Sequence, residues 1–188
     1  MDSELDLLRR RYIQKLDELY GGEIEHLNVL PEMAGVAHSS ALRSAFQYHI
    51  EKTNAHVERL DQILTWLGIR PVNFQHRETK VLAREVQRFL ATQDEMAECD
   101  AVLITAARKM EHYEISGYLL ATRYAQILQD DTAAGLLEQT LKEEYEADQI
   151  LTELDAPYSS RARDGVEHAD VLELALAGYG ATDDPVEA

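Results

Sequence analysis

Apolar residues recur every three or four positions along four long stretches of the chain, and this spacing is the period of an α-helix. The stretches run from about Ser3 into the thirties, from Ser39 to Gly68, from about Glu95 to Gln129, and from about Thr132 to Leu154. Alternation of β-branched and polar residues, the pattern of a half-buried strand, is not found between them. The pattern therefore predicts an all-α chain.

Proline and glycine mark the expected ends of these helices. Pro31 is expected to kink or end the first helix, the turn before Pro71 to stop the second, and Pro157 to end the fourth. A shorter amphipathic segment, about Glu78 to Leu90, is expected to form a crossover helix whose apolar residues offer a dimer surface. The order of two long helices, a short crossover helix and two further long helices is typical of a four-helix bundle with one long connection. Residues 1–156 are expected to form this bundle, and residues 157–188 a mobile C-terminal tail with one short helix.

Acidic residues occupy positions at which the helical pattern expects a core. Each residue advances about 100° around a helix, which turns one group of side chains inward near the middle of their helices: Glu23, His26, Glu111, Glu114, Glu144 and Asp148. Buried carboxylates repel one another, so they must be protonated, paired or bound to a cation. Oxygen ligands with an occasional imidazole suit iron or manganese. The pattern therefore indicates a metal site inside the bundle.

The second helix fits this interpretation less simply. His49, Thr53 and His56 lie on or beside its apolar stripe, Lys52 lies at the edge of the stripe, and Glu51 points away from it. We include His56 among the candidate metal ligands, although a histidine without a metal is the commoner occurrence. The ammonium of Lys52 offers an alternative, because it could pair with the inward acids and replace the charge of a metal ion.

The charge balance excludes several classes of protein. The 188 residues include 18 basic and 35 acidic side chains, and the formal net charge is −17. This balance argues against binding to nucleic acid or to an anionic membrane. The single cysteine, Cys99, excludes an intrachain disulfide and a thiolate zinc cluster. Because neither a secretory signal nor a membrane-spanning apolar run is visible, a cytoplasmic location is expected.

Four segments of the chain resemble the YciF/YciE-type branch of the ferritin-like superfamily, over about residues 5–155. The segments are Leu19–Glu23, Phe46–Thr53 with Val57–Leu60, Met110–Ile115 with Tyr118, and Leu136–Glu144 with Asp148. The resemblance implies a ferritin-like bundle, a homodimer, an association with bacterial stress responses, and a dinuclear iron or manganese site. Its metal-binding positions would be Glu23, Glu111, Glu114, Glu144 and Asp148. Where relatives tend to carry an acid on the second helix, this chain has Lys52.

Two functions follow as hypotheses. The first is a metal-binding protein that holds one or two iron or manganese ions per chain and handles oxygen, peroxide or iron under stress. The second is a non-enzymatic dimeric scaffold or partner-binding module, in which the inward acids form a salt-bridge network around Lys52. A mineral-storing cage is weaker, because the sequence shows no sign of the assembly it needs. Enzymatic activity stays open, since no nucleophile triad, phosphate loop or paired zinc motif is visible.

Overall fold

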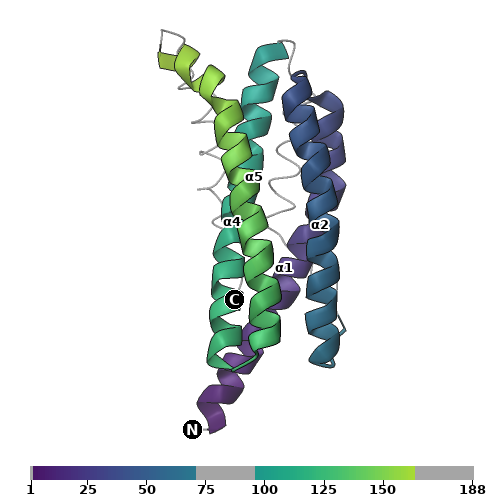
Figure 1. Ribbon diagram of the computed structural model, residues 1–188, viewed down its shortest axis with the longest axis vertical. Coiled ribbons are helices and arrows are strands. Elements are labelled where there is room, and N and C mark those ends of the chain that lie inside the picture. The colour runs from purple at the N-terminus through teal and green to yellow at the C-terminus, as the bar shows by residue number, and fades with distance from the viewer. Residues whose placement is uncertain (1, 71–95, 164–188) are drawn as a thin grey trace, which may run out of the picture. The chain divides into compact units, whose positions relative to one another are not determined.

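The computed structural model describes residues 2–70 and 96–163, which form four α-helices and no strand (Figure 1). The helices are α1 (Asp2–Val36), α2 (Ser40–Trp66), α4 (Met96–Ile127) and α5 (Asp131–Arg163). The expected crossover helix at 78–90, with its dimer surface, and residues 164–188 of the expected tail lie outside the described residues. Within the described ranges, the prediction of an all-α chain is confirmed.

Hydrogen bonds from α2 and from α4 fix the turn between α1 and α2. The Leu42 N–H donates to Ser39 Oγ at 3.4 Å, so that Ser39 caps α2 as its sequence position suggests. The carboxylate of Asp100, on α4, accepts the backbone N–H groups of His38 and Ser39 at 2.8 Å each. At the other end of α2, Gly68 adopts a positive φ of 69°, a conformation that glycine tolerates best. The turn from α1 to α2 is therefore anchored to the opposite half of the bundle.

Two prolines lie inside helices rather than at their ends. Helix α1 continues past Pro31 to Val36, and helix α5 continues past Pro157 to Arg163. The expectation that Pro157 ends the fourth helix is therefore wrong, and Pro31 does not end the first. A proline removes one backbone hydrogen bond and crowds the preceding turn. In α1, buried Leu30 and Met33 flank the proline, and their packing holds the helix together across the missing bond.

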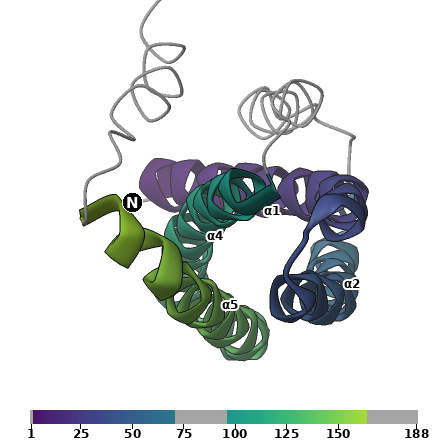
Figure 2. The same cartoon turned by 90° about the horizontal axis from the view of Figure 1, so that it is seen from above.

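The apolar core lies between all four helices, which surround a common axis in the view from above (Figure 2). Each helix contributes three buried side chains, large on α1 and α2 and mostly small on α4 and α5: Tyr12, Leu16, Leu19, Leu60, Ile63, Leu64, Tyr118, Ala121, Ala125, Ala133, Ala134 and Leu137. Alternating large and small residues let the helices pack closely. This core ends at Tyr118, whose hydroxyl reaches the acidic residues described below.

Two glycines within helices offer a matched test of this packing. A Cβ added at Gly117 of α4 would lie 2.7 Å from Leu19 Cδ2, whereas one added at exposed Gly135 of α5 would meet nothing within 4 Å. Gly135→Ala should stabilise the protein by about 0.5–1 kcal/mol, the usual gain from replacing glycine within a helix. Gly117→Ala should lose that gain, because Leu19 is buried and must shift. Urea unfolding of both variants is the measurement, and equal gains would contradict the close α1–α4 contact.

Candidate metal centre

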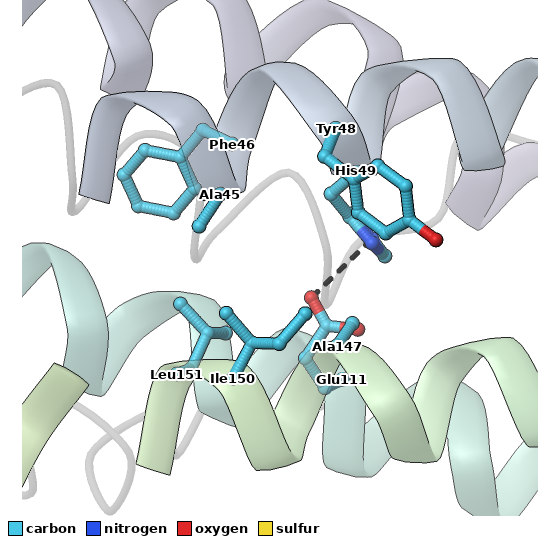
Figure 3. Close-up of a pocket in the computed structure, with 8 residues that line it drawn as sticks. All are labelled: Ala45, Phe46, Tyr48, His49, Glu111, Ala147, Ile150 and Leu151. Carbon is cyan, nitrogen blue, oxygen red and sulfur yellow. Dashed lines mark ion pairs between the residues drawn. The ribbon is translucent and has the colours of Figure 1, made fainter. Parts of the chain in front are cut away.

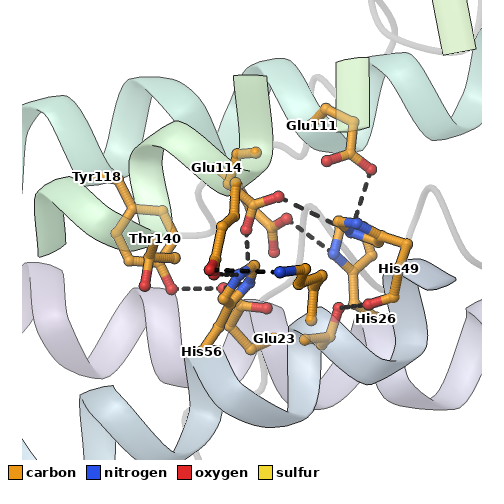
Figure 4. A network of polar contacts seen from close by, with 12 residues as sticks. Glu23, His26, His49, His56, Glu111, Glu114, Tyr118 and Thr140 are labelled. Carbon is orange, nitrogen blue, oxygen red and sulfur yellow. Dashed lines mark hydrogen bonds and ion pairs between the residues drawn. The ribbon is translucent and has the colours of Figure 1, made fainter. Parts of the chain in front are cut away.

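Seven buried acidic and imidazole side chains meet in the middle of the bundle, and every helix contributes at least one. Figure 4 labels all of them except Glu144. They are Glu23 and His26 of α1, His49 and His56 of α2, Glu111 and Glu114 of α4, and Glu144 of α5. The most exposed of them, His49, has only 5% of its surface accessible to solvent. The structure thus brings together five of the six residues predicted as metal ligands: Glu23, His56, Glu111, Glu114 and Glu144.

The ligand atoms form two neighbouring groups, in each of which they lie within 4.8 Å of one another. We call them the His49 position (His49, Glu111, Glu114 and Glu144) and the His56 position (Glu23, His56 and Glu144). His26 forms a further, overlapping group with His49 and Glu114. Such a set of oxygens and imidazole nitrogens is a donor set that a divalent transition metal accepts.

Glu144 faces both positions, one carboxylate oxygen toward each. Its Oε2 lies 3.8 Å from His49 Nε2, and its Oε1 lies 2.8 Å from His56 Nδ1. His49 Nε2 is also 3.4 Å from Glu111 Oε1, and His56 Nδ1 is 3.4 Å from Glu23 Oε1. The carboxylate of Glu144 is therefore placed to bridge two ions, or to serve either one alone.

Many polar atoms of this cluster lack a hydrogen bond among the described residues. His26 Nδ1 lies 2.8 Å from Glu114 Oε2, yet neither atom makes an aligned hydrogen bond. The same is true of both oxygens of Glu144 and both ring nitrogens of His49. Buried polar groups are ordinarily hydrogen-bonded, and leaving one unpaired costs about 1–3 kcal/mol. A bound cation would satisfy carboxylate oxygens and imidazole nitrogens that lack hydrogen bonds and converge on a common centre.

Burial raises the pKa of three of the carboxyl groups when no cation is present. Burial raises the pKa of Glu111 well above its usual range, and the charge of Glu144 adds to this effect. Burial likewise raises the pKa of Glu114, with the charge of Glu23 as the next cause. The pKa of Glu23 is raised as well, by burial and then by Glu144. A metal ion that binds here must therefore displace protons.

Glu144 and His56 behave differently, because they form a buried ion pair. Burial on its own would raise the pKa of Glu144, but the facing imidazoles of His56 and His49 lower it to about 2. Burial would lower the pKa of His56, but the facing carboxylates of Glu144 and Glu23 raise it to about 11. His49 stays neutral, since burial lowers its pKa to about 4. In the metal-free protein, the proton on His56 thus partly offsets the charge of the carboxylates.

A second layer of polar side chains holds His56 in its orientation. His56 Nε2 lies 3.0 Å from Glu143 Oε2, which leaves Nδ1 directed at the cluster. The guanidinium of Arg59 donates to Glu143 at 2.6 and 3.2 Å and to the hydroxyl of Thr140 at 3.0 Å. Burial would raise the pKa of Glu143, but its hydrogen bonds from Arg59 lower it to about 2. Glu143 is therefore a charged partner of the kind that orients metal-binding histidines.

Asp148, the sixth predicted ligand, does not join the cluster. Its side chain is 20% exposed, and its Oδ1 lies 2.9 Å from Arg108 Nε and 3.1 Å from His112 Nε2. Asp148 follows Glu144 by four residues, an offset of about 40° around the helix, and at this offset its carboxylate meets Arg108 and His112 instead of the central acids. Both basic partners are on α4, so the expectation that Asp148 points into the bundle centre is wrong.

Lys52 lies at the margin of the site rather than among the central acids. Its side chain is 30% exposed, and its Nζ lies 3.5 Å from Glu143 Oε1 and 5.3 Å from the ring centroid of Tyr48. The hypothesis of a network centred on Lys52 therefore does not fit this geometry. The cation closest to the acids is the imidazolium of His56.

Replacing Lys52 with glutamate should leave the amount of bound metal unchanged. Among the described residues, the half-exposed lysine contacts the Glu143 carboxylate and the Tyr48 ring. Exposed ion pairs contribute less than about 1 kcal/mol. Elemental analysis and a thermal midpoint, measured for Lys52→Glu and the parent protein, check this. An increase in bound metal would show that position 52 reaches the cluster after all.

The histidines His26 and His49 were not among the ligands predicted from the sequence. His26 follows Glu23 by three residues, and this spacing places it inward from the sequence alone, although it was not counted among the ligands. His49 lies one heptad before His56 on α2, and only the positions of α4 and α5 reveal its acidic neighbours.

Comparisons with known proteins agree with this fold. Residues 7–162 match the family described as "Domain of unknown function (DUF892)". Protein YciF of Escherichia coli K12 is 32% identical over 148 residues, which is 76% of this chain and 87% of YciF. The crystal structure of the E. coli stress protein YciF matches with a TM-score of 0.76 at 30% identity, over 79% of this chain and 94% of that one.

A ferritin-like, diiron-carboxylate protein from Bacillus anthracis has the same fold. Its TM-score is 0.62 at 19% identity, over 78% of this chain and 96% of that chain. The expected ferritin-like bundle is therefore confirmed. Among the described helices, none combines the length and the apolar character needed to cross a membrane.

Proposed function

The chain belongs to the DUF892 family, a YciF-type branch of the ferritin-like proteins, and on this premise we propose that its central cluster binds iron or manganese. The stoichiometry is one or two ions per chain, at the His49 and His56 positions. The observation that carries the proposal is the group of buried carboxylate and imidazole atoms that lack hydrogen bonds while converging on shared centres. Carboxylates with imidazoles suit these two metals better than they suit soft thiolate-seeking ions.

Each residue of the cluster has a role in holding such ions. Glu144 would bridge, while Glu111 with Glu114 and Glu23 with His56 would complete the two positions. Tyr118 donates its hydroxyl hydrogen to Glu23 Oε1, which fixes that carboxylate from the side of the apolar core. A bound iron or manganese ion would supply electron transfer for reactions with oxygen or peroxide. The surrounding apolar core limits water around the site.

The biological setting is part of the proposal. YciF of E. coli is described as a stress protein, and we extend a role under stress to this chain. We further propose that the protein acts in the cytoplasm as a homodimer, as the family resemblance implies.

A scaffold or partner-binding module is the second candidate, and one observation favours it. Arg59, Glu143, His56 and Glu144 form a continuous chain of charges that neutralises part of the acidity without any metal. In this account the network stabilises the bundle, and no cation enters.

Metal content separates the two candidates. Protein purified metal-free would be dialysed without oxygen against ferrous iron or manganous ion, and the bound metal counted by elemental analysis. The proposal predicts one or two ions per chain for at least one of these metals. A content near zero for both would favour the scaffold.

A further inference from the structure

A small cavity opens between α2 and α5 and ends at the candidate metal centre. Its inner end is formed by His49 and Glu111, the first two residues of the His49 position (Figure 3). Tyr48, which also lines the cavity, is 44% exposed. The cavity volume is about 10 Å³, which is room for roughly one water-sized molecule. The cavity therefore borders both the exposed Tyr48 and two residues of the His49 position.

The walls of this cavity are apolar and partly made of small residues. Ala45 of α2 and Ala147 of α5 line it together with Phe46, Ile150 and Leu151. In Figure 3 the side chains of α2 face those of α5, and the pair of His49 and Glu111 lies at one end. Because an alanine side chain ends at its Cβ, positions 45 and 147 leave space that a larger residue would fill.

The chemistry of the walls selects against ions. Moving a charged group from water to an apolar passage without compensating partners is strongly unfavourable. An anion meets a further barrier, since the chain has a formal net charge of −17. A small uncharged molecule meets neither barrier.

We infer that this cavity is the entry route and binding place for a small uncharged molecule, of the size of dioxygen or hydrogen peroxide, at the His49 position. The inference rests on the proposed function, since it gives the metal at that position its reactant. It also identifies Ala45 and Ala147 as residues that determine access by size. Organic substrates and anions are excluded from the route.

The metal-free protein allows a first test that needs no metal chemistry. Dissolved dioxygen is paramagnetic and speeds the relaxation of nearby protons in nuclear magnetic resonance spectra. The Ala147 methyl group should respond more strongly than that of Ala133, which is fully buried in the apolar core. Ala45→Leu should remove most of this response at Ala147. An equal response at the two methyl groups of the parent protein would overturn the inference.

The iron-loaded protein allows a second test with nitric oxide, an uncharged diatomic that binds ferrous iron. Its association rate would be followed by stopped-flow absorbance in the parent protein and in Ala45→Leu and Ala147→Leu. We expect slowing of about tenfold or more, equivalent to about 1.4 kcal/mol in the entry barrier. Ala55→Leu, at another half-buried alanine of α2 outside the cavity, is the matched control and should change the rate little.

The outcomes separate this inference from the proposed function. Absence of both bound iron and bound manganese in every variant would defeat the proposed function, and the dioxygen relaxation experiment would still decide whether the route exists. If iron binds normally and the nitric oxide association rates are unchanged in Ala45→Leu and Ala147→Leu, the entry route is overturned while the proposed function stands. Rapid binding of azide at the parent rate of nitric oxide would overturn the selection against anions. Should Ala147→Leu fail to fold, Ala45→Leu carries the test, because Ala45 is half-buried.

Discussion

Replacing Glu144 with glutamine is expected to remove nearly all bound metal and to destabilise the metal-free protein. Glu144 is the only residue common to the His49 and His56 positions, so both lose a charged ligand. In the metal-free protein its Oε1 lies 2.8 Å from the imidazolium of His56. A neutral amide would leave that buried charge without its nearest partner, and breaking a buried ion pair costs about 3–5 kcal/mol.

The matched control for this prediction is Glu146→Gln on the same helix. The Glu146 side chain is 49% exposed and pairs only loosely with Lys142, at 3.7 Å. Exposed substitutions of this kind change stability by about 0.5 kcal/mol or less. Elemental analysis and urea unfolding would be measured on both variants. Full metal content in Glu144→Gln would refute the bridging role, and an unchanged unfolding midpoint would refute the buried ion pair.

The stability of the metal-free protein should fall as the pH rises above about 4.5, and further above about 6.5, whereas the metal-loaded protein should gain relative to it. The pKa of His56 is raised from 6.5 to about 11, so its contribution is complete below 6.5 and is lost as the pH rises through about 11. The raised pKa values of Glu111 and Glu114 act in the same direction, since the folded protein holds protons there that the unfolded chain has released. Each such proton lowers the unfolding free energy by about 1.4 kcal/mol per pH unit.

At acid pH the stability of the metal-free protein changes with pH in the opposite direction, and different groups cause the change. The lowered pKa of His49, about 4, and that of Glu144, about 2, give stability that is present above their ordinary values of 6.5 and 4.5 and is lost toward acid. On these directions the metal-free protein should be most stable near pH 4 to 5, because the two raised carboxyl pKa values outweigh the single lowered His49 value between pH 4.5 and 6.5.

Metal binding changes the stability at alkaline pH, because the bound metal replaces the protons on its ligands. The separation between the thermal midpoints with and without manganese should widen from pH 6.5 to 8.5, as proton competition weakens. At a free metal concentration of about 100 times the dissociation constant, the stabilisation should reach about 2.7 kcal/mol. Calorimetric scans at three pH values provide the measurement. A separation that is zero, or that narrows with rising pH, would contradict a site built from protonated carboxyl groups.

Local periodicity explains which parts of the site could be predicted from the sequence. Glu111 and Glu114 stand three residues apart on the apolar stripe of one helix, so their burial follows from helical geometry alone. Glu23 and Glu144 follow from the same rule. Their distances from one another do not, because those depend on how four helices are packed.

The failures of prediction have equally specific causes. Asp148 lies close enough in phase to seem inward, but Arg108 and His112 of another helix pair with it at the surface. The position of Lys52 at the edge of the stripe predicts that it can pair with the inward acids. In the structure its partner is Glu143, which also accepts a hydrogen bond from Arg59. Contacts of this kind join residues far apart in the sequence, and no periodicity within one helix encodes them.

The central claim, that the buried cluster holds metal ions, is tested most directly by X-ray diffraction from crystals soaked in manganous ion. Data collected at the manganese absorption edge locate the metal by its anomalous signal, independently of any interpretation of the protein density. The account predicts an anomalous peak within coordination distance of Glu144, at the His49 position, the His56 position or both. Manganese peaks found only at surface carboxylates, with none beside Glu144, would contradict it.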